Sequence, residues 1–287
     1  MLRAVAALLL VASLARAAPD AVRWRRESWG QRGHPVLAIA LDGRTGEVAF
    51  GDELGASRAA VGEPGRRVVR TAAVTDLVFD RDGALWIATE NGLWQHARGA
   101  PAAADRSPAP GEAARHVHRL AAAGSALAVA SEAGVFASID GSPWSRVGRG
   151  AAGGGATAVA LRCHSAERCE LWWLVAASVW RGELERAAGT VRVANIRQEI
   201  VPGAPVGVAP LDVLVGSRVA EVVLLYPRAL AFRADTESGG GWSVWRPVMP
   251  PGAVVHRIGF ALGRLWLSTD RGLLQAEDPR LGWSRAG

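Results

Sequence analysis

One phrase recurs along this chain of 287 residues and limits what it can fold into. Residues 80–96 read DRDGALWIATENGLWQH. The dipeptides Asp-Gly at 82–83 and Asn-Gly at 91–92 favour tight turns, because both residue types tolerate a left-handed backbone. The run at 85–89 between them is apolar and β-branched, as suits a pleated strand. With the apolar segment 74–79, the phrase predicts short antiparallel strands and no helix.

Similar segments recur along the chain, and some match the phrase less closely than others. VHRLAAAGSALAVASEAGVFASID, around residue 127, and VHRIGFALGRLWLSTDRGLLQAED, near the C-terminus, keep its strands and its second glycine. Weaker copies lie at 36–57, 170–183 and 221–232. The positions equivalent to the second glycine are Gly55, Gly92, Gly134, Ser178, Ala229 and Gly272. They are 37, 42, 44, 51 and 43 residues apart. A unit of roughly 40–45 residues with about four strands is typical of a β-propeller blade.

A fourth, outermost strand with tryptophan follows several copies, as in SPWSRVG (142–148), GWSVWRP (241–247) and GWSRAG (282–287). RWRRESWG at 23–30 resembles such a strand without the rest of its blade, which suggests that a strand exchanged between the termini closes the ring. We therefore predict an all-β fold: one β-propeller of about six four-stranded blades, or seven if the N-terminal stretch belongs to a further blade. The units are expected to begin near 36, 74, 117, 157, 211 and 255.

We expect three kinds of residue to hold the repeated units together: turn glycines, strand tryptophans and the residue that ends the second strand. They are Gly83, Trp86, Thr89, Gly92, Trp94, Gly134, Trp144, Trp266 and Gly272. The single tyrosine, Tyr226, aligns with Thr89 and is predicted to lie in the core. Two biased segments, the Arg-rich 58–70 and the Ala- and Pro-rich 98–115, are predicted to be solvated loops between units.

The N-terminus carries the features of a secretory signal. Residues 1–17 read MLRAVAALLLVASLARA, with a basic start, an apolar stretch too short to span a bilayer, and a small-residue cleavage site. We predict a signal peptide over 1–17 and a single propeller domain over 18–287. The expected product is soluble, without a membrane span, and is exported to the periplasm or the cell exterior.

The two cysteines fit an exported protein. Cys163 and Cys169 flank HSAER inside the fourth unit, between two predicted strands. An oxidising compartment favours a disulfide between them. A metal site made of Cys163, His164 and Cys169 is the alternative, although no fourth ligand is in view.

The charge does not indicate a nucleic-acid partner. The formal net charge is +6, and all 33 basic residues are arginine. They are scattered along the chain, whereas a nucleic-acid-binding protein usually shows a clustered basic stripe. We expect no nucleic acid among the partners.

Residues 74–96 resemble the two-component-regulator propeller repeat. The matching residues are Asp80, Gly83, Leu85, Trp86, Ile87, Thr89, Gly92, Leu93 and Trp94, while Ala88 stands where that family commonly has glycine. The resemblance implies a propeller of the kind that senses ligands in the periplasm for histidine kinases. Residues 138–144 also resemble the Asp box of sialidase-type propellers, with one residue missing, and 268–272 resemble its first half. In those families the box is a structural turn. Photosystem assembly-factor propellers are similar in repeat style.

The most informative polar residues lie where innermost strands are expected to begin. They are His118 and Arg119 in one unit, His256 and Arg257 in another, and Asp76 at the equivalent place in a third. An innermost strand lines the central channel of a propeller, so these side chains could form a ring that binds a carboxylate, uronate or phosphate. The alternative is that they pack between blades or lie in solvent.

No catalytic motif, metal site or cofactor site is found in the sequence. We predict a non-catalytic exported binding scaffold or sensor, whose partner is an envelope protein or an anionic glycan. One alternative is a carbohydrate-active hydrolase or lyase with its site at the channel mouth. The other is an assembly factor for a membrane complex.

Overall fold

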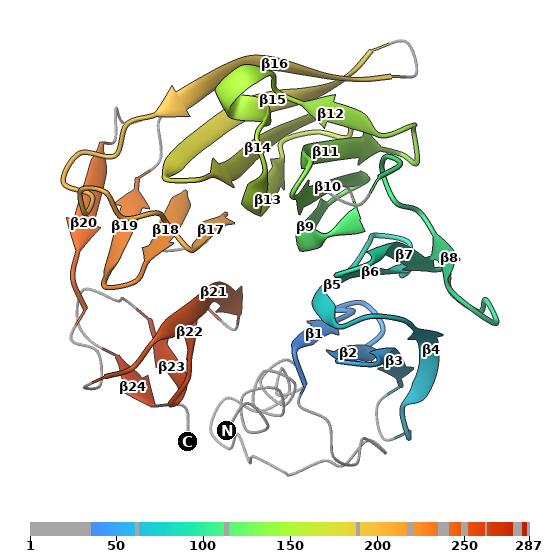
Figure 1. The fold of residues 1–287 in the computed structure, drawn as a ribbon. Helices are drawn as coiled ribbons and strands as arrows, with labels where there is room; N and C mark the ends of the chain where they lie inside the picture. The colour runs from blue at the N-terminus through green and yellow to red at the C-terminus, as the bar shows by residue number, and fades with distance from the viewer. Residues whose placement is uncertain are drawn as a thin grey trace.

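The computed structural model is a six-bladed β-propeller (Figure 1), in which each blade is a four-stranded antiparallel sheet. It describes residues 36–60, 63–111, 115–187, 190–216, 221–234, 241–247, 252–261, 263–277 and 283–285. Six blades are counted in these ranges. The predicted signal peptide and the stretch 23–30 lie outside them, so the proposed terminal strand exchange and seventh blade stay predictions.

In every blade the strands run in chain order, with the first of the four innermost. Blade one holds β1 (Ala38–Leu41), β2 (Val48–Asp52), β3 (Gly55–Ala59) and β4 (Arg66–Arg70), and blade two holds β5 (Val74–Phe79), β6 (Leu85–Thr89), β7 (Gly92–His96) and β8 (Ala104–Asp105). Blade three holds β9 (Val117–Ala123), β10 (Ala126–Ser131), β11 (Gly134–Ile139) and β12 (Ser145–Val147), and blade four holds β13 (Ala156–Cys163), β14 (Arg168–Val175), β15 (Ser178–Ala187) and β16 (Thr190–Glu199). Blade five holds β17 (Asp212–Val215), β18 (Val222–Tyr226), β19 (Ala229–Arg233) and β20 (Trp242–Trp245), and blade six holds β21 (Val255–Ala261), β22 (Arg264–Thr269), β23 (Gly272–Ala276) and β24 (Ser284–Arg285).

The core lies between neighbouring blades. Leu85 and Ile87 of blade two pack in one buried layer with Ala49 of blade one. Trp173 of blade four is fully buried in a layer that includes Val135 of blade three. Burying one large apolar side chain contributes about 1.5–3 kcal/mol, so these shared layers hold the ring together.

The predicted repeat frame is confirmed at the hairpin between the second and third strands. All six positions predicted as equivalent open a third strand, each paired across a two-residue loop with the last residue of the second strand. In blade two, Thr89 pairs with Gly92, and its Oγ1 donates to the Gly92 carbonyl oxygen at 2.9 Å. The turn residues are Glu90 and Asn91, not Asn91 and Gly92 as predicted, because Gly92 opens the strand with φ +124°.

Two further predictions from the strand pattern have different outcomes. The tryptophan-bearing segments of blades three, five and six do contain outer strands β12, β20 and β24. The prediction that 58–70 is a loop is wrong, because β3 and β4 occupy much of it. Val68 and Val69 are buried there, while Arg67 is neutralised by the buried Asp52 at 2.8 Å. The segment 98–115 likewise contains the short strand β8.

Cys163 and Cys169 face each other across β13 and β14 and form a disulfide, as predicted. The alternative metal site is wrong, because the bond consumes both thiols. Tyr226 is 3% exposed and belongs to the core, also as predicted. Within the described ranges, no helix has the length and apolar character needed to cross a membrane.

Candidate functional site

The innermost strands bring one register position of every blade to the central channel. In each blade this residue lies opposite the next-to-last residue of the second strand. The six residues, which we call the channel ring, are Ala38, Asp76, Arg119, Ala158, Asp212 and Arg257. In blade order the ring reads Ala-Asp-Arg twice, so the two three-blade halves of the propeller carry the same pattern.

The charged members of the channel ring connect blades two, three, five and six. Arg257 Nη1 donates to Asp76 Oδ1 at 2.8 Å, and Asp76 Oδ2 accepts from the Leu120 amide at 3.0 Å. In the other half, Arg119 Nε lies 3.7 Å from Asp212 Oδ1. Asp212 Oδ2 accepts from the amide of Ile258, the residue after Arg257, at 3.2 Å. The two halves therefore repeat one contact pattern.

The structure brings together three of the residues predicted for the channel mouth. Asp76, Arg119 and Arg257 lie around one channel cavity of about 280 Å³. His118 lines a second cavity of about 350 Å³ at the mouth, also beside Arg119 and Arg257. Burial and the neighbouring His116 lower the pKa of His118. His256 is exposed. Whether this mouth binds an anion stays a prediction.

Sequence reasoning missed Asp212, although a signal was present. The fifth unit was predicted to begin at 211, and the aspartate directly follows that point. Asp212 lies 17 residues before Ala229 and Asp76 lies 16 residues before Gly92, so an alignment at the hairpins that allows a one-residue difference in the first turn places the two aspartates together. Burial raises the pKa of Asp212, while Arg119 opposes that effect.

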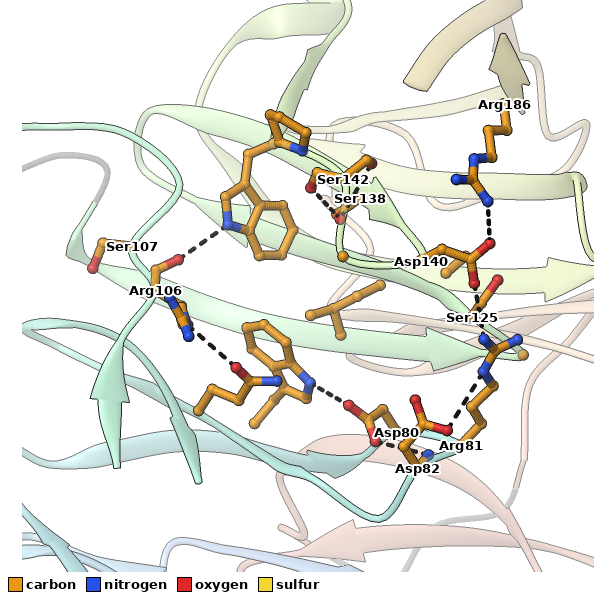
Figure 2. A pocket seen from close by; sticks show the side chains of 18 of the residues that line it. Asp80, Arg81, Asp82, Arg106, Ser107, Ser125, Ser138, Asp140, Ser142 and Arg186 are labelled. Atoms are coloured by element: carbon orange, nitrogen blue, oxygen red, sulfur yellow. Dashed lines mark hydrogen bonds and ion pairs between the residues drawn. The ribbon is translucent and has the colours of Figure 1, made fainter. Parts of the chain in front are cut away.

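A third and larger concavity, which we call the Trp cleft, lies between blades two and three (Figure 2) and holds about 880 Å³. The turn between β5 and β6 and strand β8 form one wall, and the β9–β10 and β11–β12 loops, at one end of blade three, form the other. Trp86 and Trp144 meet inside it edge to face, with ring centroids 6.0 Å apart. Their perpendicular arrangement is one that aromatic pairs prefer.

Asp80 fixes one wall of the Trp cleft. Its carboxylate accepts the amides of Asp82 and Ala84 at 3.0 and 2.9 Å, which sets the predicted Asp-Gly turn. It also accepts the Trp86 Nε1 hydrogen at 2.9 Å. Trp144 Nε1 donates to the Arg106 carbonyl oxygen at 3.1 Å. Both indole N–H groups are thus used within the fold, so the ring surfaces are what remains for a ligand.

Asp140 fixes the opposite wall by joining three blades. This residue of blade three pairs with Arg81 of blade two at 3.0 Å and with Arg186 of blade four, as Figure 2 shows. It belongs to the box-like segment, and Ser138 Oγ donates to the Ser142 carbonyl oxygen at 2.7 Å to close that turn. The segment is therefore a structural turn, as its resemblance to the Asp box implied.

The carboxylates of the Trp cleft accept hydrogen bonds from the surrounding fold. Burial alone would raise the pKa of Asp105, but hydrogen bonds from Ser107 and the charge of Arg115 outweigh it and lower the pKa. Asp80 and Asp140 already accept bonds from amides, an indole and guanidinium groups. General acid catalysis needs a carboxyl that stays protonated near neutral pH. Asp105, whose pKa is lowered, does not meet this requirement.

Comparisons with known proteins support the fold. Residues 70–91 match the two component regulator propeller family. No curated protein matches the chain in sequence. The extracellular domain of the putative hybrid two component system BT4673 from B. thetaiotaomicron is 13% identical with a TM-score of 0.68, over 89% of this chain and 33% of that one. The chain thus spans about a third of the length of that domain.

Two other similar structures belong to proteins with different roles. YCF48 bound to D1 peptide is 14% identical with a TM-score of 0.57, over 87% of this chain and 80% of that one. AFV00434, an ancestral GH74 enzyme, is 12% identical with a TM-score of 0.59, over 88% of this chain and 43% of that one. At such low sequence identities, the similarity shows a shared fold and says nothing of a shared function. The chain is therefore a β-propeller that carries, at residues 70–91, a repeat of the two-component-regulator type.

Proposed function

We propose that this chain is an exported, non-catalytic binding module, a scaffold or sensor, that holds its partner at the Trp cleft. The observation that carries this proposal is the construction of the cleft walls. Asp80 and Asp140 already make hydrogen bonds and ion pairs within the fold. Asp80 and the Arg106 carbonyl oxygen hold two perpendicular indoles, Trp86 and Trp144, that line a preformed cavity of about 880 Å³. Aromatic surface beside a few fixed polar groups is typical of binding sites.

A protein segment is the partner that we favour for this cleft. A propeller of similar fold, YCF48, is known in complex with D1 peptide. Arg81, Arg106 and Arg186 lie among the cleft residues, alongside Asp82 and Asp105. Charges of both signs around aromatic anchors suit a polypeptide with a mixed surface. The signal-like N-terminus supports a location in the periplasm or outside the cell.

The test compares two tryptophans with matched surroundings. Trp144 meets Trp86 in the cleft at 6.0 Å, and Trp242 of blade five meets Trp172 of blade four at 6.1 Å, both edge to face. Proteins from a cell-envelope extract are crosslinked to the wild type and to Trp144→Ala and Trp242→Ala. We expect one stoichiometric partner that Trp144→Ala loses and Trp242→Ala keeps. Thermal melts of all three proteins check that they are folded.

Two results would count against the proposal. Equal capture by Trp144→Ala and the wild type would remove the cleft from the binding surface. Turnover of envelope polysaccharides by the wild type, abolished by Asp80→Asn or Asp140→Asn, would establish the enzyme alternative in its place.

A further inference from the structure

The two halves of the channel ring differ in the hydrogen bonds that their arginines make. Arg257 makes a 2.8 Å hydrogen bond to Asp76 and a second to the Thr75 carbonyl oxygen. Arg119 occupies the equivalent position, yet its Nε is 3.7 Å from Asp212, beyond hydrogen-bonding distance. Its one hydrogen bond among the described residues runs from Nη1 to the His118 carbonyl oxygen at 3.3 Å.

This difference has an energetic consequence, because Arg119 is the more buried of the two. Its side chain is 17% exposed, against 33% for Arg257. Arg119 Nε is buried without a hydrogen-bond partner. A guanidinium carries five N–H donors, and a buried donor left unpaired costs free energy. Burial, followed by the like charge of Arg257, lowers the pKa of Arg119 against the opposing charges of Asp212 and Asp76.

Asp212 is poorly placed to accept a hydrogen bond from the Arg119 guanidinium. Its Oδ1 accepts from the Val213 amide at 3.0 Å and its Oδ2 from the Ile258 amide at 3.2 Å. The backbone therefore fixes the carboxylate on blade five, away from the guanidinium. Asp76 is fixed in the same way by Arg257 and by the Leu120 amide.

The space beside Arg119 is open to the mouth of the channel. The mouth cavity of about 350 Å³ is lined by Arg119, His118 and Thr157 and, on its apolar side, by Leu37 and Val74. Glu90 also lines it and is exposed. Arg257 lines the cavity too, so the cavity joins two guanidinium groups, of which that of Arg119 is the more buried, and a hydroxyl to a short apolar wall, with a carboxylate towards solvent.

We propose that Arg119 is the anchor of a small-molecule site in the channel mouth, which takes a monocarboxylate with a short apolar body. The carboxylate lies against the guanidinium, where charge-assisted bonds are strongest, and the apolar body lies against Leu37 and Val74. Glu90 disfavours a second negative charge at the outer end, so a dicarboxylate binds less well. This site is separate from the Trp cleft and does not depend on a partner bound there.

The test measures heats of binding of butyrate, its neutral counterpart butyramide, and succinate to the full protein. We expect butyrate to bind and butyramide to bind at least about ten-fold more weakly, because the amide forfeits the charge-assisted bonds. Succinate is expected to fall between them. Arg119→Met should abolish the preference for butyrate, and Arg119→Lys should retain part of it. Arg192→Met, at an exposed arginine of β16, is the matched control and should behave as the wild type.

A measurement on the unaltered protein covers the case in which Arg119→Met does not fold. Crystals soaked in bromide should show an anomalous peak within hydrogen-bonding distance of the Arg119 guanidinium. The proposal would be overturned if only water lay at that place and if butyrate and butyramide bound with equal affinity. Neither result bears on partner capture at the Trp cleft, so the two proposals fail separately.

Discussion

Gly92 shows how a single residue sets the geometry of a blade. Its φ of +124° lies in a region that side chains rarely adopt, and a Cβ there would lie 2.9 Å from Ser107 Oγ. Gly92→Ala should therefore lower the free energy of unfolding by about 1–3 kcal/mol. Gly43→Ala is the control, since no atom lies within 4 Å of its Cβ position, and its effect should stay within about 0.5 kcal/mol. Urea unfolding of both variants tests this, and equal losses would contradict it.

His96 gives the protein a pH dependence at the residue scale. Burial lowers the pKa of this histidine, and the charges of Arg58 and Arg66 add to the effect, against opposing contributions from the Ala100 carbonyl and Glu47. The unfolded chain therefore takes up a proton at a higher pH than the fold does. The stability that His96 contributes is present above its unfolded pKa of about 6.5 and is lost as the pH falls through the folded pKa.

The His96→Gln variant should show a shallower loss of stability between about pH 7 and pH 5 than the wild type. Denaturant midpoints measured across this range give the slope. His256→Gln, at an exposed histidine, is the control and should keep the wild-type slope. An unchanged slope in His96→Gln would mean that other groups set the acid sensitivity.

At the scale of elements, the disulfide closes a short loop on blade four. The sequence separation of Cys163 and Cys169 is 6, so the entropy removed from the unfolded chain is small. Replacing both with serine should cost about 2 kcal/mol. Reduction of the wild type should lower the unfolding midpoint by the same amount as the double substitution. A larger loss in the substituted protein would point to packing of the sulfur atoms.

The sequence predicted well those strands and turns that a local residue pattern indicates by itself. The spacing of apolar runs, with a turn glycine in four of the six units, placed all six central hairpins, because local backbone preference and burial agree there. The Arg-rich 58–70 was misread because its charges are neutralised by distant partners, as Arg67 is by Asp52. The Trp cleft could not be predicted, since it depends on contacts such as Asp140 with Arg186 that only the packing of neighbouring blades creates.

At the scale of the whole molecule, the channel ring joins blades that are distant in the sequence. Asp76 and Arg257 are 181 residues apart, and their pair spans the channel at 2.8 Å. Asp76→Ala should cost about 2–3 kcal/mol, less than a fully buried pair would lose, because Arg257 is 33% exposed and partly screened.

A double-mutant cycle isolates this pair. Asp76→Ala combined with Arg257→Ala should cost clearly less than the sum of the two single losses, with a coupling of about 1 kcal/mol or more. Each free energy comes from equilibrium unfolding in urea. Additive losses would mean that the two side chains stabilise the ring independently, through contacts such as Asp76 with the Leu120 amide.

The repeated Ala-Asp-Arg order has a consequence for how the molecule could be divided. A cut between β12 and β13 would give two fragments of three blades, one with Asp76 and Arg119 and the other with Asp212 and Arg257. Each fragment would be neutral at the channel, yet the opposite charge that each of its residues faces would be on the other fragment. Association of the two fragments would therefore pair the channel charges of both at the same time. The association is expected to weaken as salt is added, because salt screens these charges.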